Sequence, residues 1–486
     1  MSAELLSRLQ FALTVSFHFI YPPISMGLGL LLVVMAAMYV RTRDPLWRRS
    51  SFFWVRVYGL VFAMGIATGI VQEFEFGTNW STYARYVGNI FGSLLAAEGI
   101  FAFFLEGGFL GLMLFGGDRL GPRMWLLATF LVVFGAHFSA LWILMANSWM
   151  QTPRGFVVQE TQWGSMAVMT SFAEVVTTPS FLPRLLHTWV ASWMVGASLV
   201  LSVSAWYLLK RRHLAFARRN LTLALWVFAV LSVLQAVIFG ANMAISVTNN
   251  QQVKLAAMEG VWQSEPCTPM FLMGWVDEAA QTTTGISIPC LLSILAYQDP
   301  QAVVTGLPAF PQDVWAPVNL TFQVYHLMID LGGLFPLIGL AGLVALWWKR
   351  RVFTFRPLLW VFVGTIVLTE LATLSGWWTA EIGRQPWVVW NQLRTADAVS
   401  PVLAGTQVLL SLVMFALLYA LLFSLFLFLL NGKIQEGPAE LEPADRPDSL
   451  PDTFREVFRH HPRASASGEP QLPVPAGAGQ RTTQDA

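Results

Sequence analysis

The residues from Trp377 to Trp387 read WWTAEIGRQPW and place an acid, a cation and a proline at the end of a long apolar segment. Ionised groups such as Glu381 and Arg384 at the mouth of a membrane helix carry a high desolvation cost unless a partner compensates. A cofactor that has both a metal and acidic groups would use both residues, with the carboxylate on the metal and the guanidinium on an acidic group. A simple juxtamembrane ion pair is the alternative interpretation.

Histidine is scarce, and four of the seven histidines fall in apolar segments. These four are His18, His137, His187 and His326, and Met328 follows the last of them by two residues. An ionisable side chain inside a membrane is costly and is therefore a candidate for function, although a structural hydrogen bond explains any one of them equally well. Neutral imidazole, thioether and carboxylate are all possible ligands of heme iron.

Two acids share a third apolar segment, where Glu106 follows Glu98 by eight residues. In a helix this spacing puts the second carboxyl about 12 Å further along the axis. Two carboxyls at successive depths along one helix suit a proton relay across part of the membrane, and Ser139 in the next segment would extend this relay. The alternative is a buried carboxyl that stays neutral or pairs with a polar neighbour.

The elements that must position these residues are transmembrane helices. The 486-residue chain is 55% hydrophobic and only 12% charged, a composition typical of a polytopic membrane protein. Apolar segments of roughly 20 residues or more each suffice to cross ~30 Å of hydrocarbon as a helix. They lie at about 11–40, 52–72, 94–116, 123–146, 184–209, 219–243, 320–348, 356–378 and 401–430. We therefore expect an all-α membrane bundle of about nine helices, whose first helix is retained and not cleaved as a signal.

Loop charges predict the orientation of this bundle. The cations of one alternate set of loops are Arg41, Arg43, Arg48, Arg49, Arg119, Arg123, Lys210, Arg211, Arg212, Arg218, Arg219, Lys349, Arg350, Arg351 and Arg356. This set should be cytoplasmic, which leaves the N-terminus and the long loop at 244–319 outside. We divide the chain into helices 1–6 (1–243), the outer loop (244–319), helices 7–9 (320–430) and a polar tail (431–486) that we expect to be disordered and cytoplasmic.

With this orientation, potential ligands from five helices lie at one depth. His18, His187 and Met328 fall near the outer ends of their segments, as do Glu98 and Glu381. A transporter would more often place its site at the bilayer midplane. The shared depth therefore predicts several redox centres near the outer face of the membrane.

The outer loop contains the segment KLAAME, from Lys254 to Glu259. A lysine can donate to a quinone oxygen and a glutamate can accept a proton from quinol, although this segment alone is also typical of a solvated helix.

The chain's two cysteines, Cys267 and Cys290, lie in the same loop. A disulfide and two free thiols both fit the sequence.

These residues resemble subunit I of the cytochrome bd-type quinol oxidases, over about residues 5 to 430. The motifs that carry the resemblance are SRLQFALTVSFHF (7–19), FEFGTNWS (74–81), EGIFAFFLE (98–106), SALWILMANSWMQ (139–151), KLAAME (254–259) and GRQPW (383–387).

The resemblance implies a terminal respiratory oxidase of the bacterial inner membrane, with a periplasmic N-terminus and a cytoplasmic C-terminus. Quinol would be oxidised at the outer loop by Lys254 and Glu259, and dioxygen would be reduced to water at a di-heme site with cytoplasmic protons, building a membrane potential without pumping. The expected cofactors are a low-spin heme b, a high-spin heme b, and heme d or a further heme b. The expected partners are ubiquinol or another quinol, dioxygen, the lipid bilayer and a second membrane subunit. The resemblance is also compatible with a small single-helix subunit, and no nucleic acid is expected.

The resemblance also assigns roles to the candidate ligands. His187 and Met328 would be the two axial ligands of the low-spin heme, while His18 and Glu381 would each bind a high-spin heme, in a pairing that stays open. Glu98 would stand at the oxygen-reducing centre, and the other residues of the proposed relay would deliver protons to it.

Two departures from the family pattern affect this assignment. Members of the family often have arginine two residues before the low-spin methionine, where this chain has His326. Residues two apart on a helix point roughly 200° apart, so His326 and Met328 cannot both face one iron. The outer loop after Gly274 is short and resembles the short-loop branch, which includes forms called cyanide-insensitive.

Three rival functions are weaker. A heme-copper oxidase needs more intramembrane histidines than the four present here. A transporter without heme would be colourless, and a purely structural subunit would leave the intramembrane acids without a purpose.

Overall fold

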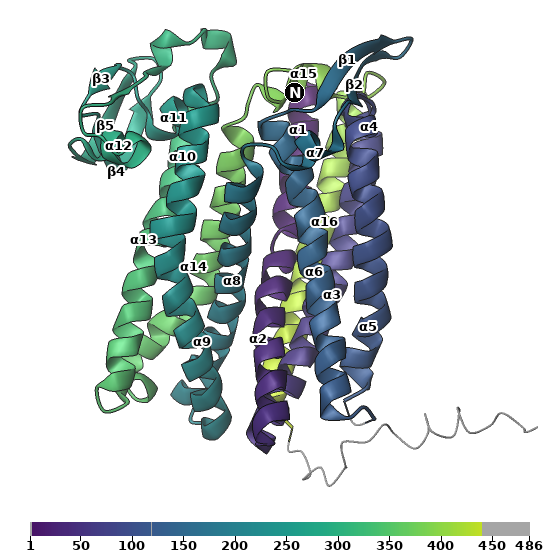
Figure 1. Cartoon of the computed structure of the whole chain (residues 1–486), viewed down its shortest axis with the longest axis vertical. Helices are drawn as coiled ribbons and strands as arrows, with labels where there is room; N and C mark the ends of the chain where they lie inside the picture. The colour runs from purple at the N-terminus through teal and green to yellow at the C-terminus, as the bar shows by residue number, and fades with distance from the viewer. Residues whose placement is uncertain (1, 118, 440–486) are drawn as a thin grey trace, which may run out of the picture.

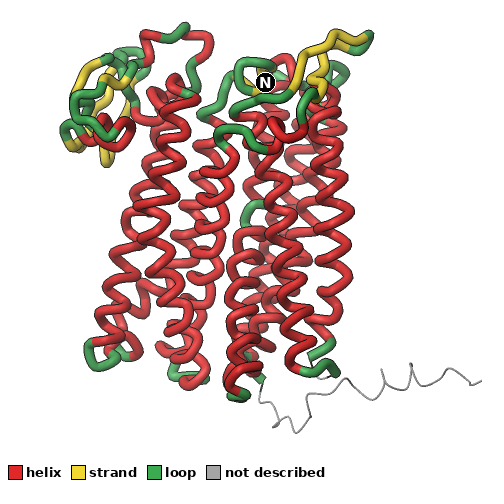
Figure 2. The backbone as a smooth tube through the Cα atoms, viewed as in Figure 1, coloured by secondary structure: helices red, strands yellow, loops and turns green. Residues whose placement is uncertain are grey.

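The computed structural model describes residues 2–117 and 119–439. Within these residues, nine helices are long and apolar enough to cross a membrane, as the sequence predicts. They stand side by side as one bundle, and the strands are confined to one end of it (Figures 1 and 2). We call this the sheet end. The N-terminus also lies there, and the turns between α2 and α3 and between α8 and α9 lie at the opposite end.

The first four spans pack in the half of the bundle that contains the N-terminus. They consist of α1 (Ala3–His18), α2 (Tyr21–Thr42), α3 (Pro45–Thr78), α4 (Ser81–Ala97), the π-helix η1 (Glu98–Phe103), α5 (Phe104–Phe115) and α6 (Pro122–Gln151). The first span is broken after His18, and α2 then begins with prolines in its first turn. Proline suits this position, because its missing N–H would have had no partner in the helix. The break leaves His18 as the last residue of α1.

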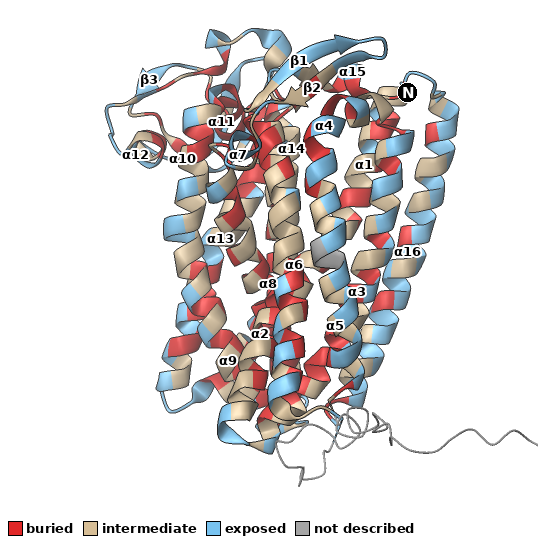
Figure 3. Ribbon diagram, turned by 45° about the vertical axis from the view of Figure 1, so that its right-hand side comes forward, coloured by how far each residue is buried: buried red, intermediate tan, exposed pale blue. Residues whose placement is uncertain are grey.

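The remaining five spans complete the bundle. They are α8 (Phe181–Leu209), α9 (Leu214–Leu234) continued by the π-helix η2 (Gln235–Phe239) and α10 (Gly240–Asn250), then α13 (Val318–Trp347), α14 (Arg356–Ile382) and α16 (Gly405–Glu436). In α8, 89% of the apolar window is buried, against 11% in α16, so α8 is central and α16 peripheral. Figure 3 shows α16 at the edge of the bundle with many exposed residues. The expected tail, 431–486, begins inside α16 and then lies largely outside the described residues.

Short elements cover the sheet end. The helices are α7 (Phe172–Val176), α11 (Gln252–Glu259), α12 (Leu291–Tyr297) and α15 (Thr395–Ala398), and the 3-10 turns are η3 (Leu307–Ala309) and η4 (Gln312–Val314). The 3-10 turn η5 (Arg351–Phe353) lies at the opposite end, between α13 and α14. The strands form four two-stranded antiparallel sheets: β1 (Phe156–Thr161) with β2 (Gly164–Met169), β3 (Glu265–Pro266) with β6 (Val303–Val304), β4 (Met270–Asp277) with β5 (Thr282–Ile288), and β7 (Trp387–Val389) with β8 (Leu393–Arg394).

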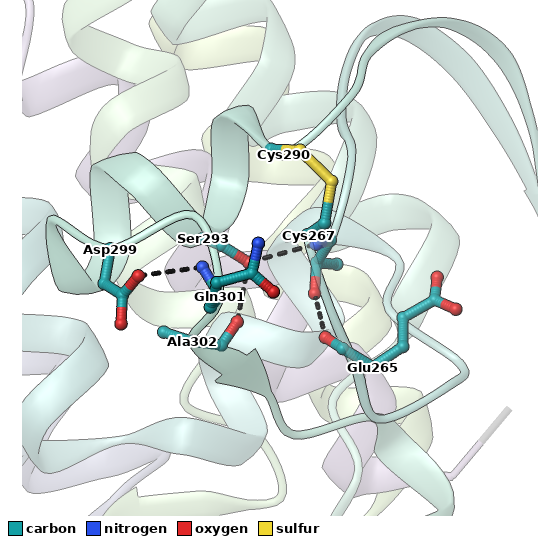
Figure 4. Close-up of a disulfide and its surroundings, with 8 residues drawn as sticks. Glu265, Cys267, Cys290, Ser293, Asp299, Gln301 and Ala302 are labelled. Atoms are coloured by element: carbon teal, nitrogen blue, oxygen red, sulfur yellow. Dashed lines mark hydrogen bonds between the residues drawn. A yellow bond between two sulfur atoms is a disulfide. The ribbon is translucent and has the colours of Figure 1, made fainter.

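The outer loop expected at 244–319 is thus folded. A disulfide between Cys267 and Cys290 joins the segment before β4 to the start of α12 (Figure 4). Ser293 of α12 accepts a hydrogen bond from the Thr268 N–H at 3.0 Å and donates one to the Ala302 carbonyl at 2.8 Å. The loop therefore has its own covalent and polar links.

The helices α2 and α8 cross closely in the core, at Gly27 and Gly196. A β-carbon at Gly196 would lie 2.1 Å from the backbone carbon of Gly27. Backbone cannot move aside as a side chain can, so both positions require glycine.

We predict that Gly196→Val separates α2 from α8 and lowers the thermal midpoint of the detergent-solubilised protein by several degrees, because overpacking a core typically costs about 1–3 kcal/mol. Gly364→Val on α14 is the matched control, since no atom lies within 4 Å of a β-carbon placed there. Equal thermal midpoints for the two variants would contradict this account of the crossing.

Candidate heme and quinol sites

His18 is held by one ring nitrogen. Thr68 of α3 donates its hydroxyl hydrogen to the Met64 carbonyl at 2.8 Å, so its oxygen is left to accept from Nδ1 of His18 at 2.9 Å. This hydrogen bond places the ring proton on Nδ1 and leaves the lone pair on Nε2. The hydrogen bonds among the described residues include none to Nε2. A histidine that ligates a metal usually donates its other ring N–H in this way.

His187, in the second turn of α8, is held from the side by η2. The Gln235 amide lies 3.0 Å from Nδ1 of His187 and donates to the His187 backbone carbonyl at 3.1 Å. The carbonyl of Phe239, the last residue of η2, also contacts the ring. Single π-helical turns inside α-helices often occur at functional sites, and here the turn brings two polar groups to one imidazole.

Met328 lies on α13 and packs against α14 at a glycine. A β-carbon at Gly376 would be 2.8 Å from the Met328 sulfur, so any larger residue would displace the thioether. The segment η2 packs against both α8 and α13, and it therefore links the helices of His187 and Met328.

The other two intramembrane histidines use both ring nitrogens. His137 contacts the Val133 carbonyl at 2.8 Å and accepts from the Trp193 indole N–H at 2.8 Å. His326 faces the carbonyls of Phe322 and Phe271, each at 2.9 Å. Neither ring has a nitrogen available for iron in this arrangement. This difference favours Met328 over His326 as the ligand on α13.

Glu381, at the end of α14, is held by two donors. Asn147 of α6 donates to one carboxylate oxygen at 3.0 Å, and Arg384 donates to the other. The expected partner of Arg384 was an acidic group of a cofactor. The structure pairs one nitrogen of its guanidinium with Glu381, while another, Nη1, is buried without a hydrogen-bond partner among the described residues.

Two further buried cations surround this pair. Lys254 of α11 donates to the Ala380 carbonyl at 2.9 Å and to the Gln151 side chain at 3.2 Å. Arg184 of α8 is close enough to act electrostatically on Lys254, Glu381 and Arg384, and two of its guanidinium nitrogens are buried without partners among the described residues. Burial, with a further contribution from Arg184, holds the pKa of Lys254 well below its usual range. We call Arg184, Lys254, Glu381 and Arg384 the cation cluster.

Glu259 lies at the other end of α11 and does not share the surroundings of Lys254. Its carboxyl is buried beside Tyr325, and one of its oxygens lies 4.0 Å from Nε2 of His326. Burial raises the pKa of Glu259 to about 7, and a hydrogen bond with Tyr325 offsets part of this effect. Gly260 ends the helix at φ +63°, where a β-carbon would meet the Thr283 hydroxyl at 2.7 Å. The two residues of KLAAME thus face different groups.

The acids of the third span lie at a π-helix. Glu98 begins η1 and accepts a hydrogen bond from Ser139 of α6 at 2.7 Å. Glu106, in α5, is close enough to interact electrostatically with Glu98 and with the buried Tyr58 of α3. Ser139, which the sequence grouped with Glu106, is therefore bonded to Glu98.

Residues 6–438, most of the chain, match the family described as Cytochrome bd terminal oxidase subunit I. The chain belongs to this family. It is 34% identical to the cytochrome bd ubiquinol oxidase subunit 1 of Bacillus subtilis (strain 168), with 94% of this chain and 99% of that protein covered. It is also 34% identical to the cytochrome bd-II ubiquinol oxidase subunit 1 of Escherichia coli (strain K12), with 90% and 97% covered.

The fold of this oxidase subunit agrees with its family. The structure of bd oxidase from Geobacillus thermodenitrificans matches it with a TM-score of 0.82 at 28% identity, covering 90% of this chain and 99% of that one. The resemblance inferred from the motifs is confirmed, and so are the all-α bundle and the multi-pass membrane location.

Four polar residues of these sites were absent from the sequence-based prediction. Thr68, Asn147 and Gln235 each hold a candidate ligand from a neighbouring helix. Their sequence positions carry no signal, because a hydroxyl or amide in an apolar segment is common. Arg184 does carry one, since it is a cation three residues before His187 in an apolar segment.

We predict that His326→Ala loosens the β4–β5 hairpin. Its imidazole contacts the Phe271 carbonyl, next to a break in the β4–β5 register, and removing a partner of a buried polar group costs about 1–3 kcal/mol. Amides of β4 and β5 should then exchange with deuterium at least several-fold faster. Met328→Leu keeps the imidazole and should leave this exchange unchanged. Equal protection of β4 and β5 in both variants would contradict the proposed role of His326 in holding the hairpin.

Proposed function

We propose that this oxidase subunit oxidises quinol at Glu259 on the sheet end of the bundle and reduces dioxygen to water at hemes held nearby, with protons drawn from the opposite end. The cation cluster is the observation that carries the proposal. It joins α11, the helix that contains Glu259, to α8 and α14, the helices of His187 and Glu381. The short helix α11 therefore connects the proposed quinol site to the helices that carry candidate heme ligands.

The cluster fits a cofactor with acidic groups. Two arginines and a lysine lie around one carboxylate, and buried guanidinium nitrogens of both arginines are without partners among the described residues. An unpaired buried charge costs several kcal/mol, and propionates would supply the missing acceptors. The expected role of Lys254 in binding quinol is replaced in this proposal by a role at the propionates, because its ammonium group donates to Gln151 and to the Ala380 carbonyl, within electrostatic range of Glu381.

The open Nε2 of His18, and the engaged ring nitrogens of His137 and His326, support the ligand assignment. His187 and Met328 would hold the low-spin heme b, and His18 and Glu381 the two high-spin hemes, one a heme b and the other a heme d or a further heme b. Heme iron supplies one-electron transfer and the position at which dioxygen is reduced. Glu98 stands at the oxygen-reducing centre, where Ser139 orients its carboxyl.

Protons leave and enter through different residues. Glu259, whose pKa is raised to about 7, accepts a proton from quinol near neutral pH, and Tyr325 orients its carboxyl. Glu106 passes protons from the opposite end toward Glu98. Electrons and protons then meet from opposite sides, so charge separates across the membrane without a pump.

The distribution of loop cations supports the orientation. The turns rich in arginine and lysine gather at the end opposite the sheets, where Arg49 and Arg212 donate to backbone carbonyls at the C-terminal end of α16. This end is therefore cytoplasmic and the sheet end periplasmic. A second membrane subunit and a quinol complete the active complex, by analogy with relatives that are named as subunit 1 of ubiquinol oxidases.

We predict that the purified complex shows low-spin and high-spin heme b absorbance, and that Met328→Leu removes the low-spin signature alone. The thioether is the assigned ligand, whereas His326→Ala should preserve that signature because both ring nitrogens of His326 are already engaged. Loss of the low-spin bands in His326→Ala but not in Met328→Leu would reverse the assignment. A colourless folded complex would refute the proposed function.

The quinol reaction should depend on the charge of Glu259. A base must be unprotonated to accept a proton, so quinol turnover should rise as the pH increases through about 7 and then level off. Glu259→Gln should abolish that rise and slow quinol turnover by roughly a hundredfold. Turnover with artificial donors that bypass the quinol site is the control and should be unaffected. Equal losses with both kinds of donor would place Glu259 elsewhere in the reaction.

A further inference from the structure

Glu370 is a buried acid that the proposed reaction has not yet used. It lies in the middle of α14, and both of its carboxyl oxygens are buried without a hydrogen-bond partner among the described residues. A buried carboxylate without a donor or cation carries a high desolvation cost and usually takes up a proton instead. An acid with only a structural role would be expected to have a partner.

Tyr21, on another helix, lies close enough to this acid to interact with it electrostatically. Tyr21 begins α2, is fully buried, and has a hydroxyl without a partner among the described residues. Glu370 is the charged group that acts on it electrostatically. Phe17 and Phe426 lie against the Tyr21 ring, and Thr369, which precedes Glu370, is hydrogen-bonded to Ser198 at 2.7 Å.

The pair lies one helical turn inward from His18. On α3, a β-carbon at Gly69 would lie 3.3 Å from the His18 ring, and one at Gly65 would lie 3.6 Å from Tyr21. These glycines are four residues apart, so Tyr21 is about 6 Å further from the sheet end than His18. On α14, Glu370 precedes Glu381 by eleven residues, which is close to three full turns. Glu370 and Glu381 therefore share a helix face, with Glu370 about 16 Å further in.

We propose that Glu370 and Tyr21 form a second proton-delivering pair for dioxygen reduction, separate from Glu106 and Glu98. The inference rests on the proposed function, in which four protons and four electrons convert one dioxygen to two waters. In each delivery the Glu370 carboxylic acid gives up one proton through the Tyr21 hydroxyl, becomes a carboxylate, and is reprotonated from the cytoplasmic side. The electrons come from quinol, so the pair itself is neither oxidised nor reduced.

The test uses the purified, heme-loaded complex in vesicles, with Glu370→Gln and Tyr21→Phe as variants. Thr373→Val is the matched control, because it removes a hydroxyl from the same helix without removing an acid. Two measurements are made: the rate of proton uptake from the cytoplasmic side during one turnover, and the infrared carboxylic-acid stretch. Heme spectra report whether each variant is assembled.

Glu370→Gln should slow proton uptake by roughly tenfold to a hundredfold and remove one infrared carboxylic-acid band, while the heme spectra stay unchanged. Tyr21→Phe should slow uptake but keep that band, and Thr373→Val should match the wild type. If Glu370→Gln fails to assemble, Tyr21→Phe decides by itself, since it leaves the carboxyl in place.

Wild-type uptake in both variants would overturn this inference and leave the proposed function intact. A wild-type complex without hemes, or without proton uptake from the cytoplasmic side, would overturn both.

Discussion

Two arginines and a lysine are buried around a single carboxylate between α8, α11 and α14, and the two guanidinium groups require further acceptors there. Buried guanidinium nitrogens of Arg184 and Arg384 are without partners within the described part of the chain. Because an uncompensated buried charge costs several kcal/mol, the cluster is suited to bind the acidic groups of a cofactor. It also ties α11, the helix of Glu259, to two helices that carry candidate iron ligands.

Hydrogen bonds decide which histidines are available to a metal. His18 donates from Nδ1 to a threonine hydroxyl and keeps its other nitrogen open, whereas His137 and His326 engage both ring nitrogens with protein groups. The same residue type therefore serves as a candidate ligand in one span and as a structural clamp in another. In His326 the clamp connects α13 to β4, so this histidine takes part in holding the folded outer loop on the bundle.

Irregular turns position two of the functional groups. The π-helices η1 and η2 begin at Glu98 and Gln235, and each departs from regular helix where a polar side chain meets a neighbouring helix. The break between α1 and α2 has a similar effect, because it leaves His18 at a helix end and starts the next helix with Tyr21. Departures from regular helix thus coincide with the residues to which we assign chemistry.

Composition and hydropathy alone determined the all-α bundle of nine spans and the grouping of the loop cations at one end, because a lipid bilayer admits few other structures for such a chain. The motifs were sufficient to identify the oxidase family, since an acid, an arginine and a histidine in apolar segments are too costly to be common. Tertiary structure decided that Ser139 bonds Glu98, that Lys254 and Glu259 face different groups, and that Glu370 lies within electrostatic range of Tyr21. These pairings depend on contacts between helices far apart in sequence. The sequence of a single apolar segment does not specify which neighbouring helix its polar side chains will face.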